Sequence, residues 1–201
     1  MASKTKRTLK SSRTVAWLII IAGFLGLAGA TQLTLEKIHL LEDPNFIPSC
    51  TLNPIFSCGN VMMSWQASAL GPPNMLIGIA AYAAVITFGV LALAGTKLPR
   101  WTWGALSIGT LLGVIYSMWL MTQSFYVIGN LCLYCMLVWA VSIALFVGTT
   151  LFSLRSGVFG GSQGLRDKAA AIAPYSWVIV IIWYAIIFAL LIIRFPNALV
   201  F

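Results

Sequence analysis

The chain has 201 residues, of which 60% are hydrophobic and only 8% are charged, and its mean hydropathy is +0.96. A water-soluble fold of this composition would expose far too much apolar surface, so the composition excludes a soluble globular domain and indicates an integral membrane protein. The formal net charge of +8 could suggest nucleic acid as a partner, but the basic residues are sorted between apolar segments, which favours a lipid bilayer instead.

Five apolar segments have the roughly 20 residues that a helix needs to cross a bilayer. They are Val15–Leu33, Met75–Ala94, Trp101–Thr122, Cys132–Phe152 and Ser176–Ile193. Ten of the twelve Lys and Arg residues lie in three places: before the first segment, between the second and third segments, and between the fourth and fifth segments. The positive-inside rule therefore places the N-terminus in the cytoplasm and the C-terminus outside. We expect residues 1–14 to form a cytoplasmic basic tail and residues 153–175, rich in Gly and Ser, to form a cytoplasmic linker.

The first outer connection, residues 34–74, contains two of the four cysteines. Prolines break any helix around Cys50, which leaves this thiol on a flexible stretch that a partner protein could reach. From Cys58 to Leu70 the pattern predicts a short amphipathic helix on the outer surface, acting either as a lid or as a simple interfacial helix. Asn74 then opens the second span, where general principles favour a capping role for its amide.

The other two cysteines, Cys132 and Cys135, lie three residues apart in the first turn of the fourth span, so they share one helix face. Unpaired N–H groups and the positive end of the helix dipole stabilise a thiolate there. Trp139 follows one turn later on the same face, where it packs or lines a pocket for a planar ligand. All four cysteines thus lie on the outer side, where disulfides persist.

Two thiol pairs on one face of a membrane bundle suggest a relay. An exposed pair would exchange with a soluble protein, and a membrane-embedded pair would exchange with a lipid-soluble oxidant. A disulfide that only staples the loop would explain Cys50 and Cys58, but it would not explain Cys132 and Cys135, whose backbone the helix already holds. The spacings disfavour a zinc site made of the four cysteines.

With these features the sequence resembles the vitamin K epoxide reductase family, in its bacterial branch. The resemblance covers about residues 14–152 and rests on an ordered set: Cys50 and Cys58 with seven residues between them, Ser64, Asn74 at the second span, and Cys132-x-x-Cys135 at the fourth. It implies an all-α membrane protein in which residues 15–152 form a four-helix catalytic domain around a quinone of the menaquinone, ubiquinone or vitamin K type. Residues 176–201 would add a fifth transmembrane helix and a short outer tail.

The resemblance also implies a role for each thiol. Cys135 would interact with the quinone ring, Cys132 would exchange with Cys58, and Cys50 would form a mixed disulfide with the thiol substrate. Electrons would then run from the partner through the loop pair to the helix pair and on to the membrane quinone pool. We expect such an enzyme in the bacterial inner membrane, with its active site facing outside, where it would support disulfide formation in exported proteins.

Two further residues are assigned by the same resemblance. Asn74 would donate a hydrogen bond to a quinone oxygen, which replaces the capping role, and Ser64 would help to hold the lid near the site. We expect Trp139, from its place on the helix face of Cys135, to line the same quinone site. Vertebrate members carry a tyrosine at the position of Trp139, so their epoxide chemistry is not transferred. Many bacterial members continue into a thioredoxin-like domain, whereas this chain ends at Phe201, so we expect a separate extracytoplasmic thioredoxin-fold (DsbA-like) partner.

Two alternatives stay open at this point. A DsbB-type oxidase performs the same chemistry on an analogous bundle, but its Cys-x-x-Cys pair lies in the first outer loop, the reverse of the order here. A membrane scaffold or transporter subunit with structural disulfides belongs to another class of protein. It predicts that Cys135→Ala leaves function intact, whereas the oxidase predicts that quinone reduction is lost.

Overall fold

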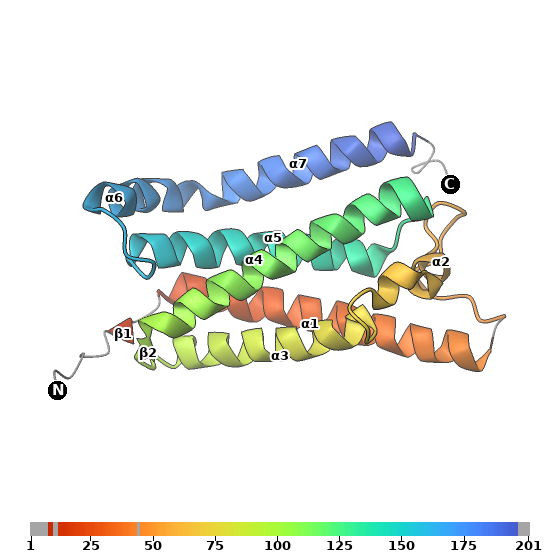
Figure 1. Ribbon diagram of the computed structural model, residues 1–201, viewed down its shortest axis with the longest axis horizontal. Helices are drawn as coiled ribbons and strands as arrows, with labels where there is room; N and C mark the ends of the chain where they lie inside the picture. Colours follow the sequence, from red (N-terminus) through yellow and green to blue (C-terminus); the bar gives the residue numbers. More distant parts are fainter. Residues whose placement is uncertain (1–7, 10–11, 44, 197–201) are drawn as a thin grey trace.

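A computed structural model describes residues 8–9, 12–43 and 45–196 of the chain. Most of the expected basic tail at residues 1–14 and the end of the expected outer tail, residues 197–201, lie outside the described residues. Five long helices run nearly parallel to one axis of the molecule (Figure 1). They are α1 (Arg13–Glu42), α3 (Asn74–Leu93), α4 (Arg100–Gln123), α5 (Leu133–Arg155) and α7 (Ser176–Arg194).

Within the described residues, five helical stretches are long and apolar enough to cross a membrane, which confirms the expected multi-pass protein. α1 packs against α3 and α5, α4 packs against α5, and α7 lies along the flank formed by α4 and α5 (Figure 1). Small residues permit close packing of α1 against α3, since a Cβ atom on Gly26 would overlap the ring of Tyr82. α1 also continues well past Leu33, so that its last turns project beyond the bundle.

Short elements connect these helices. They are β1 (Thr8–Leu9), which pairs antiparallel with β2 (Leu98–Pro99), the helices α2 (Cys58–Met63) and α6 (Gln163–Ile172), the 3₁₀ turns η1 (Trp65–Ser68) and η3 (Ala173–Tyr175), and the π-helix η2 (Ser124–Ile128). The π-helix extends α4 and leaves only a short turn before α5.

Two expectations about the connections are corrected. The amphipathic helix expected from Cys58 to Leu70 is broken at Ser64 into α2 and η1, because the Ser64 hydroxyl donates to Val61 O at 2.7 Å and ends α2 there. The linker expected at residues 153–175 contains α6, because its glycines are confined to its first part and an alanine-rich run that favours helix follows.

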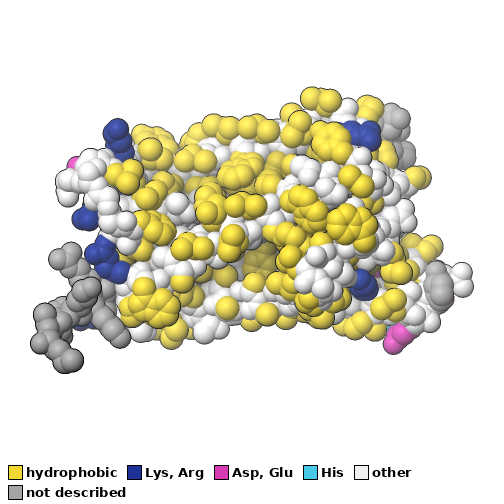
Figure 2. All heavy atoms as spheres, in the orientation of Figure 1, with side chains coloured by type: hydrophobic (Ala, Val, Ile, Leu, Met, Phe, Trp, Pro, Cys, Tyr) yellow, Lys and Arg dark blue, Asp and Glu magenta, His cyan; other side chains and the backbone are white. Residues whose placement is uncertain are grey.

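The two ends of the bundle differ in their charge. Lys and Arg gather at the end where β2 and α6 lie (Figure 2), which we call the basic end. Its described members are Arg13, Lys97, Arg100, Arg155, Arg166 and Lys168. The loop that follows α1, with α2, lies at the opposite end, which we call the cysteine end (Figure 1). Hydrophobic side chains cover the middle of the face in Figure 2, as expected for a surface in contact with lipid.

Candidate active site

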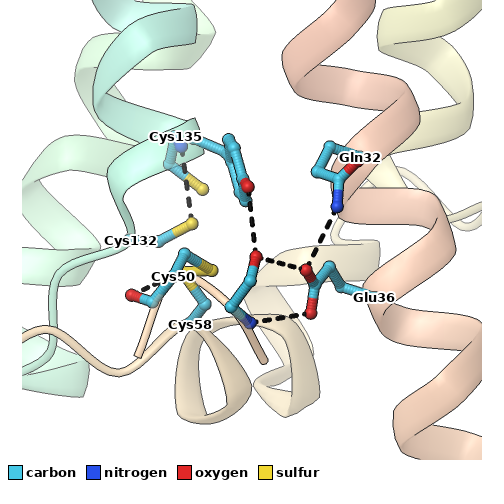
Figure 3. The surroundings of a disulfide bond; sticks show 8 residues. Gln32, Glu36, Cys50, Cys58, Cys132 and Cys135 are labelled. Carbon is cyan, nitrogen blue, oxygen red and sulfur yellow. Dashed lines mark hydrogen bonds between the residues drawn. A yellow bond between two sulfur atoms is a disulfide. The ribbon is translucent and has the colours of Figure 1, made fainter. Parts of the chain in front are cut away.

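Three of the four cysteine sulfurs meet at the cysteine end. Cys50 and Cys58 form a disulfide, and Cys132 and Cys135 are free thiols. The Sγ atoms of Cys50, Cys58 and Cys132 all lie within 4.8 Å of one another, and Figure 3 shows the disulfide directly below Cys132. Small movements of the side chains would bring Cys132 into contact with the disulfide, so the arrangement is poised for thiol–disulfide exchange.

Backbone contacts dock the loop disulfide in this place. Leu131 N donates to Ile55 O at 2.8 Å, and Phe56 and Leu131 form an isolated parallel β-bridge. The side chain of Asn130 adds a bond to Pro54 O at 2.7 Å. The loop is thus fixed to the turn that leads directly into Cys132.

The start of α5 favours a thiolate at Cys132, as its position predicted. Cys132 is the N-cap of α5, and its Sγ atom accepts a hydrogen bond from Cys135 N at 3.4 Å. The positive end of the α5 dipole lies at the same position, and both effects stabilise a thiolate. Cys132 is therefore the sulfur of its pair that the start of the helix favours as a thiolate.

A buried carboxylate that the sequence analysis missed holds the residue next to Cys50. Glu36, on the extension of α1, is only 4% exposed, and it accepts hydrogen bonds from Ser49 N at 3.0 Å and from Ser49 Oγ at 2.5 Å. Gln32 Nε2 donates to the same carboxylate at 3.2 Å (Figure 3). The hydroxyl of Tyr134 lies 3.2 Å from Ser49 Oγ. The network joins α1, the loop and the first turn of α5.

A long cavity of about 600 Å³ is lined by Cys135 at its cysteine end. Its walls come from α1, α3, α4 and α5, with α2 and η1 closing the cysteine end, and it extends to Trp101 near the basic end. The lining is almost wholly apolar. Figure 2 shows a hollow near the middle of the lipid-facing surface beside α4. A cavity of this shape has room for a flat ring at one end and an apolar tail along its length.

Polar groups enter this cavity at its cysteine end. Asn74 and Ser64 line it there, together with Tyr116. Asn74 does not cap α3, whose N-cap is Pro73 without a side-chain bond, so the capping role is wrong. Instead, Asn74 Nδ2 donates to Gln66 O at 2.7 Å, and Tyr116 OH donates to Asn74 Oδ1 at 2.7 Å. Tyr116 thereby fixes the orientation of the amide, and among the described residues one amide hydrogen is left for a ligand.

The model of the vitamin K epoxide reductase family matches residues 17–150. The chain belongs to the vitamin K epoxide reductase family. No match was found among curated proteins. Membership implies a membrane thiol–disulfide oxidoreductase linked to a quinone, and a disulfide with two free thiols beside it agrees with that activity.

The cavity fits the quinone that the family uses. Asn74 supplies a hydrogen-bond donor, Cys135 supplies a thiol, and Trp139 supplies a flat apolar wall. Trp139 is 3% exposed, and it packs edge-on against Phe125 with 6.1 Å between ring centroids, so it both packs and lines the cavity. A planar ring with two carbonyl oxygens and an isoprenoid tail matches this combination of groups.

One expectation about the vitamin K epoxide reductase site is wrong in this conformation. Cys50 is only 2% exposed, so it does not lie open to a partner protein. The loop is folded inward against Cys132 because Glu36 and Leu131 hold it there. Glu36 and Tyr116 carried little signal in the sequence, since each acts through a residue distant in the chain. That Glu36 is one of only four acidic residues was the available hint.

Proposed function

We propose that the chain oxidises a thioredoxin-fold partner through Cys50 and Cys58, passes the electrons to Cys132 and Cys135, and reduces a membrane quinone, which supports disulfide formation in exported proteins. One observation carries the proposal: three sulfurs lie within 4.8 Å of one another while the fourth cysteine lines an apolar cavity. A thiol relay needs such a junction between a protein-facing pair and a lipid-facing pair.

The internal exchange would move two electrons from the loop pair to the helix pair. When the loop holds two thiols and the helix pair is a disulfide, the Cys58 thiolate attacks Cys132 Sγ, and Cys135 leaves as a thiolate. Cys50 then attacks Cys58 Sγ, which restores the loop disulfide and releases Cys132. Two electrons have moved inward, and the helix pair is now a dithiol. The described structure has this product arrangement, with a loop disulfide beside two free thiols.

At the cavity, a bound quinone supplies the acceptor for two electrons and two protons. Cys132 and Cys135 give these up as they close their disulfide. Asn74 would hold the ring by donating its remaining amide hydrogen to a carbonyl oxygen, with its orientation fixed by Tyr116. Trp139 and the other apolar walls keep water from the thiols.

The partner step requires the loop to open. A partner dithiol must reach Cys50, and this thiol becomes accessible only when the hydrogen bonds of Ser49 to Glu36 and the bridge of Phe56 to Leu131 are released. The loop would thus alternate between a docked position for internal exchange and an open position for the partner. Ser64, whose hydroxyl ends α2, would help to hold the docked lid.

We further propose that the basic end faces the cytoplasm, since most described Lys and Arg residues lie there and the positive-inside rule assigns that side. The four cysteines would then face the outside of a bacterial inner membrane, where disulfides are stable.

The test is quinone reduction by the purified protein, supplied with a reduced thioredoxin-fold partner, for the wild type and each Cys→Ala variant. All four variants should lose turnover, and Cys50→Ala should in addition fail to form a mixed disulfide with the partner. A scaffold with structural disulfides predicts that wild type and Cys135→Ala give the same quinone signal, and that result would refute the proposal.

A further inference from the structure

The last helix, α7, lies outside residues 17–150, so the family match says nothing of its role. Most of α7 faces away from the rest of the protein, and Leu191 is the only one of its described residues that is buried. Phe195, the residue directly after it, is also buried. α7 also contacts α5 along its middle, where Tyr184 OH donates to Ala140 O at 2.6 Å, but its most buried residues lie at its end, beside η2 at the cysteine end.

A charged hydrogen bond marks this contact. Arg194 Nε donates to Phe125 O at 2.9 Å. Phe125 belongs to η2, the π-helix that ends α4, and carbonyls in a last helical turn lack partners within their own helix. Cations near the end of a helix satisfy such carbonyls and interact well with the helix dipole. Arg194 thus fixes a segment whose own hydrogen bonding is irregular.

The same segment forms part of the cavity wall. Ser124 and Ile128 of η2 line the cavity, and the fully buried ring of Phe125 lies between α7 and Trp139. Its centroid is 5.8 Å from that of Phe195, at 89°, and 6.1 Å from that of Trp139. A continuous series of edge-to-face ring contacts therefore runs from Phe195, at the end of α7, to Trp139, which lies one turn after Cys135. π-helical turns of this kind occur often at functional sites.

We propose that the end of α7 is a positioning element of the quinone site: Arg194 and Phe195 hold η2 and Trp139 in the geometry that binds the quinone ring. This inference rests on the proposed function. It assigns no contact between α7 and the quinone, because the effect passes through Phe125. It predicts that quinone affinity depends on α7, whereas thiol exchange at the sulfur junction does not.

The test compares Arg194→Met, which keeps length but has no donor, with Arg194→Lys, which keeps a donor, in the full-length protein. Ile193→Ala is the matched control, since this neighbouring side chain is 78% exposed. Binding of decylubiquinone is measured by quenching of tryptophan fluorescence. We expect Arg194→Met to raise Kd about tenfold, the lower end of the range for a hydrogen bond to a charged group because Arg194 is exposed, and Arg194→Lys to restore most of the affinity.

A second readout separates positioning from general damage to the fold. Arg194→Met should raise KM for decylubiquinone with little change in kcat, and it should leave exchange between the loop disulfide and Cys132 at the wild-type rate. An unchanged Kd, or an equal loss of thiol exchange and quinone binding, would overturn the inference while the proposed function stands. A wild-type protein that binds no decylubiquinone would overturn both.

Discussion

The buried carboxylate of Glu36 makes a quantitative prediction about loop docking. Ser49 donates two hydrogen bonds to it, one from N at 3.0 Å and one from Oγ at 2.5 Å. A hydrogen bond to a charged group contributes about 1.5–3 kcal/mol, and one between neutral groups about 0.5–1.5 kcal/mol. Glu36→Gln converts both bonds to the neutral class, so we expect docking to weaken by about 2 kcal/mol, or roughly 30-fold in the docking equilibrium.

The assay uses a background in which only Cys58 and Cys132 remain, made by Cys50→Ala and Cys135→Ala. The effective concentration of one thiol toward the other is measured in glutathione buffers by counting alkylated thiols. It should fall roughly 30-fold when Glu36→Gln is added. Glu42→Gln is the control, because this glutamate lies on the same helix but its side chain is 70% exposed. Equal effective concentrations in the Glu36→Gln and Glu42→Gln proteins would refute the role of the network.

Two more predictions concern the helix pair and the quinone amide. Because Cys132 Sγ is the N-cap of α5 and accepts a hydrogen bond from Cys135 N, its thiolate should form at lower pH in the folded Cys135→Ala protein than in the same protein after denaturation. A pH titration of thiolate absorbance checks this, and identical midpoints would contradict it. Asn74→Leu should raise KM for decylubiquinone about tenfold, since it removes one hydrogen bond to the quinone, while thiol exchange continues at the wild-type rate. An unchanged KM in steady-state kinetics would contradict the role of Asn74 in quinone binding.

The membrane architecture could be predicted from the sequence because hydropathy and helix length are local properties. Five apolar segments of sufficient length gave the spans, and the prolines before Asn74 marked the start of α3 correctly. The Cys132-x-x-Cys135 spacing likewise placed both thiols at the start of α5, since three residues are less than one helical turn. The order of the four cysteines identified the family that the family model confirms.

Other features depend on contacts between distant residues and could not be predicted in this way. Glu36 reaches Ser49 across the loop, and Tyr116 reaches Asn74 from another helix, so neither pairing leaves a local pattern. The inward position of Cys50 depends on docking rather than on the prolines around it. The helix α6 was not predicted because the connection was interpreted as a whole, and its Gly and Ser residues outweighed the alanine-rich run that forms the helix.

The most direct measurement is a single turnover without the thiol partner. Protein in the described redox state, with the Cys50–Cys58 disulfide and both helix thiols, is mixed anaerobically with decylubiquinone, and hydroquinone and free thiols are counted. We predict that each quinone reduced removes two thiols, those of Cys132 and Cys135, and that Cys135→Ala reduces none. Bound quinone that stays oxidised with the wild type, or reduction by Cys135→Ala at the wild-type rate, would contradict electron transfer through this pair.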